Sequence, residues 1–105
     1  MTAITTHVLD TARGKPAAGI PVTLSAQTSE GWVELGRGRT DADGRVANLM
    51  PAGALRATTF RLRFDLTDYS TFYPFVEITF TPQDDRHHHV PLLLSPFGYS
   101  TYRGS

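Results

Sequence analysis

Alternation between apolar and polar side chains is the dominant pattern along this chain. It is clearest over residues 60–66, where apolar and charged positions alternate without a break: Phe60, Arg61, Leu62, Arg63, Phe64, Asp65 and Leu66. Successive side chains of a strand point to opposite faces, so a period of two predicts one buried face and one face in water. Residues 20–27 repeat the pattern and would direct these side chains to a core: Ile20, Val22, Leu24 and Ala26.

Turn-forming residues separate the expected strands, which span residues 4–10, 20–27, 32–37, 60–66, 75–80, 88–94 and 98–103, with a short strand after residue 45. Connections such as Ser29-Glu30-Gly31 and Ser95-Pro96 are typical of turns. Thr67 and Asp68 predict the cap of one helical turn that runs to Phe72 and ends before Pro74. Short strands at this spacing predict an all-β, antiparallel sandwich. A chain of 105 residues fits one domain, 1–105.

Charge and composition exclude several classes of function. Lys+Arg and Asp+Glu are both 10, so the basic excess typical of nucleic-acid or anionic-membrane partners is missing. There is no cysteine, which excludes disulfides, thiolate metal sites and a cysteine nucleophile. No secretory signal or membrane-length apolar run is visible, so we expect a soluble, cytoplasmic protein. Near-neutral charge and an apolar content of 40% favour association with other copies.

Histidines are the first candidates for chemistry. Alternation over residues 88–94 places His89 on one face and His88 on the other, while His87 joins the face of His89. His7 lies on the face of residues 5 and 9 of its own expected strand. These side chains could be exposed histidines, acid–base groups or, taking His7, His87 and His89 together, zinc ligands. Nothing nearby in the sequence completes a zinc site.

Three further features are more ambiguous. Arg45 follows a tight turn, where its guanidinium could bind a carboxylate or carbonyl oxygen or could simply lie at the surface. Ser100 and Tyr102 share a strand face, but no base near Ser100 in the sequence supports a nucleophilic role. Residues 41–44 read Asp-Ala-Asp-Gly and lack the further ligands of a calcium loop. The residues alone thus reach a sandwich with a possible His/Arg/Tyr site.

Three segments of the sequence resemble the signatures of the transthyretin-like family. The N-terminal one is His7-Val8-Leu9-Asp10 followed by Gly14-Lys15-Pro16 and Ala18-Gly19. The middle one is Thr40-Asp41-Ala42-Asp43-Gly44-Arg45. The C-terminal one joins residues 89–96, His-Val-Pro-Leu-Leu-Leu-Ser-Pro, to residues 99–105, Tyr-Ser-Thr-Tyr-Arg-Gly-Ser. The resemblance covers essentially the whole chain. Within the family the terminal Tyr-Arg-Gly-Ser marks the 5-hydroxyisourate hydrolases rather than the thyroid-hormone carriers.

The resemblance implies a transthyretin-like sandwich of about eight antiparallel strands with one short helix, assembled as a homotetramer around a channel. It implies hydrolysis of 5-hydroxyisourate to 2-oxo-4-hydroxy-4-carboxy-5-ureidoimidazoline in urate catabolism, with no cofactor and no metal. The family's catalytic positions fall on His7, Arg45 and His89. Substrate-binding positions fall on His7, Arg45, Tyr102, Arg103 and Ser105. The family usually has tyrosine where His88 stands, and alternation directs that side chain away from His89.

The implied chemistry suits these residue types. Water adds to a lactam carbonyl and a ring C–N bond breaks, which a histidine with a pKa near ~6.5 can assist by taking and returning a proton. Arg45 could hold the urate-like oxygens and the developing oxyanion, and Tyr102 could pack on the flat heterocycle or hydrogen-bond it. Which histidine is the base stays open. Two alternatives remain: a carrier of a small ligand without turnover, and a zinc hydrolase.

Overall fold

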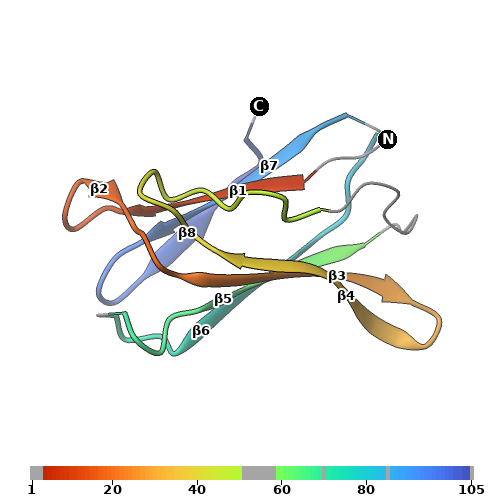
Figure 1. Cartoon of the computed structure of the whole chain (residues 1–105), viewed down its shortest axis with the longest axis horizontal. Helices are drawn as coiled ribbons and strands as arrows, with labels where there is room; N and C mark the ends of the chain where they lie inside the picture. Colours follow the sequence, from red (N-terminus) through yellow and green to blue (C-terminus); the bar gives the residue numbers. More distant parts are fainter. Residues whose placement is uncertain (1–3, 51–58, 70, 85, 105) are drawn as a thin grey trace.

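The computed structural model describes residues 4–50, 59–69, 71–84 and 86–104. These residues form two four-stranded sheets packed face to face (Figure 1). One sheet has the order β2-β1-β7-β8, from β1 (Ile4–Asp10), β2 (Lys15–Pro16), β7 (His88–Leu94) and β8 (Tyr99–Thr101). The other has the order β4-β3-β5-β6, from β3 (Pro21–Thr28), β4 (Gly31–Arg39), β5 (Phe60–Asp65) and β6 (Phe75–Phe80). The predicted all-β sandwich is confirmed.

The core lies between the sheets and is built from the alternate side chains of their inner faces. The largest fully buried ones are Phe60, Phe64, Ile4, Ile20, Leu24, Leu62, Leu66, Leu92, Leu94, Val8, Val22 and Val76. Full burial of one such side chain stabilises the fold by about 1.5–3 kcal/mol. The apolar positions of the period-two pattern are therefore the ones that join the two sheets. Their polar neighbours along each strand are left on the two outer faces.

The pairing of β1 with β7 is parallel, whereas an antiparallel sandwich was expected throughout. All other strand pairs in the described residues are antiparallel. The whole second sheet lies between β1 and β7 in the sequence, so no hairpin turn dictates their relative direction. The register of this parallel pair sets Thr5 beside His89 and His7 beside Pro91. This pair is the scaffold of the site described below.

The helical turn expected to start at Thr67 and Asp68 is not found among the described residues. The Asp65 carboxylate accepts hydrogen bonds from the backbone nitrogen of Thr67 at 3.0 Å and from its hydroxyl at 2.6 Å. The backbone nitrogen of Phe72 donates to the Pro96 carbonyl at 2.7 Å, so it does not make the hydrogen bond that a helical turn would require. Ser70 lies outside the described residues. No helix in those residues is long and apolar enough to cross a membrane.

Other differences concern short elements. β2 occupies a stretch that the sequence indicated as a turn, and it pairs Lys15 with Asp10. The strand expected after residue 45 is reduced to an isolated bridge between His7 and Arg45. β8 ends at Thr101 instead of residue 103, and the chain rejoins β7 through a bridge between Gly104 and His89. Between these two points β7 carries a proline at residue 91, which has no backbone N–H and cannot donate a hydrogen bond to the neighbouring strand.

Candidate active site

Imidazole rings gather on the outer face of the β1–β7 pair. His7 comes from β1 and His89 from β7, and their ring centroids lie 6.3 Å apart with the ring planes tilted by 44°. Both residues are half-buried. His88, which immediately precedes His89, is buried, with 6% of its surface exposed. The predicted division of β7 into a His89 face and a His88 face is therefore confirmed.

A tight turn before Arg45 holds that residue against β1. The Asp41 carboxylate accepts hydrogen bonds from the backbone nitrogens of Asp43 at 2.9 Å and Arg45 at 3.0 Å. These donors hold the pKa of Asp41 below its ordinary value, because they stabilise its charged form. The backbone nitrogen of Val8 donates to the carbonyl of Gly44 at 2.9 Å, next to the bridge between His7 and Arg45. The Asp41 carboxylate thus stabilises the turn that contains it.

Gly44 is required for this close approach. Its φ of +77° lies in the left-handed region, and a Cβ there would stand 2.5 Å from the Val8 carbonyl oxygen and 3.0 Å from Cδ2 of His7. Any larger residue would push the turn away from β1. Glycine at this position therefore lets Arg45 sit beside His7.

The electrostatic surroundings favour the neutral form of His89. Burial is the largest cause that holds its pKa below the ordinary value, and the positive charge of Arg45 acts in the same direction. A neutral imidazole can accept a proton from water.

The imidazole of His7 has one ring nitrogen without a partner. Its Nε2 atom is buried and has no hydrogen-bond partner among the described residues, a property that it shares with Nε of Arg61 and Nδ1 of His88. Leaving a buried polar atom without a partner costs about 1–3 kcal/mol, and such atoms in folded proteins call for an explanation. A bound substrate or water would supply the missing partner.

The C-terminal segment lies along His89. The backbone nitrogen of Gly104 donates to the His89 carbonyl at 2.7 Å. A Cβ on Gly104 would lie 2.9 Å from Cδ2 of His89, so the tail passes directly against the ring. Tyr102 and Arg103 are exposed and line a cavity of about 320 Å³, together with His88 and residues of β6. Ser105 lies outside the described residues.

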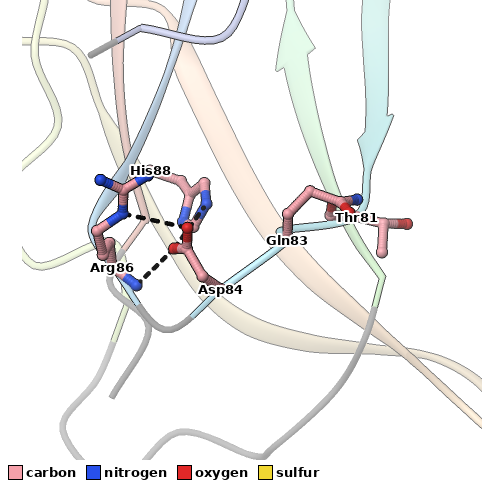
Figure 2. Close-up of polar contacts among 5 residues, drawn as sticks. All are labelled: Thr81, Gln83, Asp84, Arg86 and His88. Atoms are coloured by element: carbon pink, nitrogen blue, oxygen red, sulfur yellow. Dashed lines mark hydrogen bonds and ion pairs between the residues drawn. The ribbon is translucent and has the colours of Figure 1, made fainter.

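His88 belongs to a separate polar cluster, drawn in Figure 2. Its Nε2 lies 3.6 Å from Oδ1 of Asp84, whose carboxylate also accepts hydrogen bonds from the side chain of Arg86 at 3.1 Å and from its backbone nitrogen at 2.9 Å. The residue that departs from the usual family tyrosine therefore lies on the opposite side of β7 from His89. The sequence pattern predicted this placement.

No group of three or more His, Cys, Asp or Glu side chains suited to a metal occurs in the part of the chain that the structure describes. Two of the histidines considered as zinc ligands instead meet a hydroxyl. Thr5 Oγ1 lies 2.6 Å from His87 Nε2 and 2.9 Å from His89 Nδ1. Sequence reasoning missed Thr5 because it could not show that β1 pairs with β7. The alternation that placed Thr5 on the face of His7 was the only available signal.

Comparison with known proteins gives a consistent picture. The profile of the HIUase/Transthyretin family matches residues 4–104. The chain is 45% identical to the 5-hydroxyisourate hydrolase of Caulobacter vibrioides over 116 residues, which covers 100% of both chains. Its structure resembles that of Klebsiella pneumoniae 5-hydroxyisourate hydrolase, with a TM-score of 0.83, 32% identity and coverage of 100% and 94%. It also resembles sea bream transthyretin in complex with thyroxine, with a TM-score of 0.86, 32% identity and coverage of 96% and 93%.

Proposed function

The chain belongs to the HIUase/Transthyretin family, and from this premise we propose that it hydrolyses 5-hydroxyisourate to 2-oxo-4-hydroxy-4-carboxy-5-ureidoimidazoline. The observation that carries the proposal is the placement of two imidazoles, His7 and His89, beside Arg45 on one sheet face. Acid–base groups and a cation together are what the addition of water to a lactam carbonyl needs.

In the proposed reaction His89 acts as the general base. Its pKa is held low by burial and neighbouring positive charge, so the ring is neutral and can take a proton from water. The water oxygen bonds to the lactam carbon, and the guanidinium of Arg45 stabilises the oxyanion. The ring C–N bond then breaks, and the leaving nitrogen takes a proton from a histidine. The unpaired Nε2 of His7 is placed to hydrogen-bond the substrate.

Tyr102, Arg103 and Ser105 complete the proposal as substrate-binding residues. Their support is the bridge of Gly104, the residue between Arg103 and Ser105 in the sequence, to His89. Tyr102 and Arg103 themselves line the cavity beside His88. Because Arg103 is exposed, its removal should affect binding rather than folding. We expect Arg103→Gln to raise KM while leaving thermal unfolding unchanged.

We propose in addition that the protein works as a homotetramer. Large apolar side chains are left at the surface of the single chain, among them Phe72 at 70% exposure and Phe97 at 81%. Exposed apolar patches of this kind mark association surfaces. Sedimentation of the active protein should give four copies, and an active monomer would contradict the assembly. A cytoplasmic location stays a prediction from the sequence.

The test of function is a coupled spectroscopic assay. Urate is oxidised by urate oxidase, and the absorbance of 5-hydroxyisourate is followed with and without this protein. We expect the absorbance to decay faster when the protein is present. Decay at the spontaneous rate, with fully folded protein, would contradict the proposed hydrolysis.

A second candidate is a carrier without turnover, favoured by the similarity to sea bream transthyretin in complex with thyroxine. The outer face of β1 and β7 argues against it, because a slot for an aromatic hormone should be apolar and this face presents His7, His89 and Thr5. Calorimetric titration with thyroxine distinguishes the two. Tight binding without hydrolysis of 5-hydroxyisourate would favour the carrier.

A further inference from the structure

A threonine hydroxyl lies between two histidine rings at the edge of the site. Thr5 of β1 stands directly beside His89 of β7 in the strand register. Its Oγ1 is 2.9 Å from Nδ1 of His89 and 2.6 Å from Nε2 of His87. His89 is half-buried, whereas His87 is exposed. The three side chains form a continuous hydrogen-bonded path from the site to solvent.

A hydroxyl has one proton to donate, so this path has a direction. In one arrangement His89 Nδ1–H donates to Thr5, and Thr5 donates to His87 Nε2. In the other, His87 Nε2–H donates to Thr5, and Thr5 donates to His89 Nδ1. The first arrangement leaves His89 Nε2 without a proton, as a base. The second leaves His89 Nε2 protonated, as an acid.

We propose that Thr5 is a positioning residue that fixes the ring and tautomer of His89 and relays protons between His89 and His87. The inference deepens the proposed hydrolysis and rests on it. The geometry that carries it is the pair of short contacts on a single hydroxyl. It assigns a function to His87, which no step of the reaction described above uses.

The relay conserves protons at each step. His89 Nε2 takes a proton from the attacking water and becomes an imidazolium. Its Nδ1 proton passes to Thr5 Oγ1 as the Thr5 proton passes to His87 Nε2. His87 then releases its own Nδ1 proton to solvent. His89 is left neutral with its Nε2 protonated. When Nε2 gives that proton to the leaving nitrogen, the relay runs backwards: His87 takes a proton from solvent at Nδ1, its Nε2 proton passes to Thr5, and the Thr5 proton passes to Nδ1 of His89. This restores the first arrangement.

The surroundings of His89 favour this direction of transfer. Burial is the largest cause that lowers its pKa, and the charge of Arg45 acts in the same direction. A protonated His89 would therefore be unstable where it is. His87 can pass the charge directly to water because it is exposed.

The test compares four variants in the 5-hydroxyisourate assay. Thr5→Val keeps the branched shape and removes the hydroxyl, and Thr5→Ser keeps the hydroxyl. We expect Thr5→Val to lower kcat by about 10- to 100-fold, a part of the 10²–10⁴ that acid–base catalysis supplies. Thr5→Ser should recover most of this loss. The matched control is Thr23→Val, a threonine on the outer face of the other sheet, which should keep the wild-type kcat.

The fourth variant, His87→Ala, tests the solvent end of the path. We expect its kcat to fall and to rise again when imidazole is added, because free imidazole can accept the proton from Thr5. A wild-type kcat in His87→Ala, or no response to imidazole, would overturn the relay. Neither Thr5→Ser nor His87→Ala removes a buried side chain, so the test does not depend on the folding of Thr5→Val.

A measurement independent of activity tests the positioning. Nitrogen-15 spectra of histidine-labelled protein report which ring nitrogen of His89 carries a proton. We expect one tautomer in wild type and in Thr5→Ser, and a mixture in Thr5→Val. An unchanged tautomer, or equal losses of kcat in Thr5→Val and Thr5→Ser, would overturn the inference. If the wild-type protein itself does not hydrolyse 5-hydroxyisourate, the proposed function fails, whereas the tautomer experiment still tests the positioning by Thr5.

Discussion

The outer faces of the two sheets are both polar, but their charges are arranged differently. On the β4-β3-β5-β6 face, positive groups meet negative or aromatic partners. Arg61 and Arg63 lie 3.7 Å and 3.1 Å from the Glu77 carboxylate. Their guanidinium groups also stack on rings, Arg61 at 4.3 Å from Trp32 and Arg63 at 3.8 Å from Phe75.

On the β2-β1-β7-β8 face the imidazoles meet one another and a hydroxyl. The ring centroids of His7 and His89 lie 6.3 Å apart, and Thr5 Oγ1 lies 2.9 Å from Nδ1 of His89. The Nε2 of His7 has no partner in the described residues. In the first arrangement both guanidinium groups have an anionic and an aromatic partner within the protein, although the buried Nε of Arg61 makes no hydrogen bond among the described residues. The second leaves proton-carrying groups for a substrate, so chemistry is expected on this face.

The largest expected effect is on catalysis. His7→Gln or His89→Gln should each lower kcat/KM by about 10²–10⁴, since each removes an acid–base group. The counterpart on the other face, Arg63→Gln, should leave kcat/KM within about twofold of wild type. Steady-state kinetics of the three variants test the contrast. Comparable losses in all three would remove the distinction between the faces.

The next effect concerns the turn that supports the histidine face. Gly44→Ala combines a strained φ of +77° with a contact of 2.5 Å to the Val8 carbonyl oxygen. We expect the free energy of unfolding to fall by roughly 2–4 kcal/mol. Gly14→Ala is the matched control, since its φ is +68° with nothing within 4 Å of the added Cβ. It should cost only about 1–2 kcal/mol. Denaturant unfolding measures both, and equal losses would contradict the close approach of Gly44 to β1.

A smaller effect is expected from pH. The pKa of His89 is lowered in the folded protein, so below pH ~6.5 the unfolded chain binds this proton more readily than the native one. Stability should therefore decrease as the pH falls from about 6.5, and His89→Gln should reduce that slope. Unfolding free energies at several pH values between 7.5 and 5 provide the measurement, with pH limits chosen around the ordinary histidine pKa of ~6.5. An identical slope in the variant would show that His89 titrates normally.

The smallest effect belongs to the paired charges. Glu77→Gln removes the shared partner of Arg61 and Arg63, but these side chains are 26–44% exposed. Exposed ion pairs contribute about 0–1 kcal/mol, so we expect a loss within that range and no change in kcat/KM. Thermal unfolding and the hydrolysis assay test both statements. A large catalytic loss would mean that the second face takes part in the reaction.

Much of the fold could be read from the period-two pattern. The bounds of β1, β6 and β7 were predicted as they are observed, because alternation and flanking turn residues define strands locally. The opposite orientation of His88 and His89 followed from the same rule. The prediction of a helical turn after Asp65 was wrong, because the backbone nitrogen and the hydroxyl of Thr67 both donate to the Asp65 carboxylate.

The site could be predicted only in part, because its contacts depend on pairing between distant segments. His7 and His89 were identified as residues, but the parallel register that sets Thr5 beside His89 joins the two ends of the chain. The same holds for Gly104, whose approach to the His89 ring leaves no room for a Cβ. The local pattern of apolar and polar residues in one strand does not show which other strand will pair with it.

The central claim is that substrate meets the outer face of β1 and β7. Urate, the planar precursor of the proposed substrate, can be titrated into nitrogen-15-labelled protein while amide shifts are followed. We expect shifts centred on His7, Gly44, Arg45, His89 and Gly104, with Arg61, Arg63 and Glu77 unchanged. Shifts centred on Arg61, Arg63 and Glu77 would contradict it.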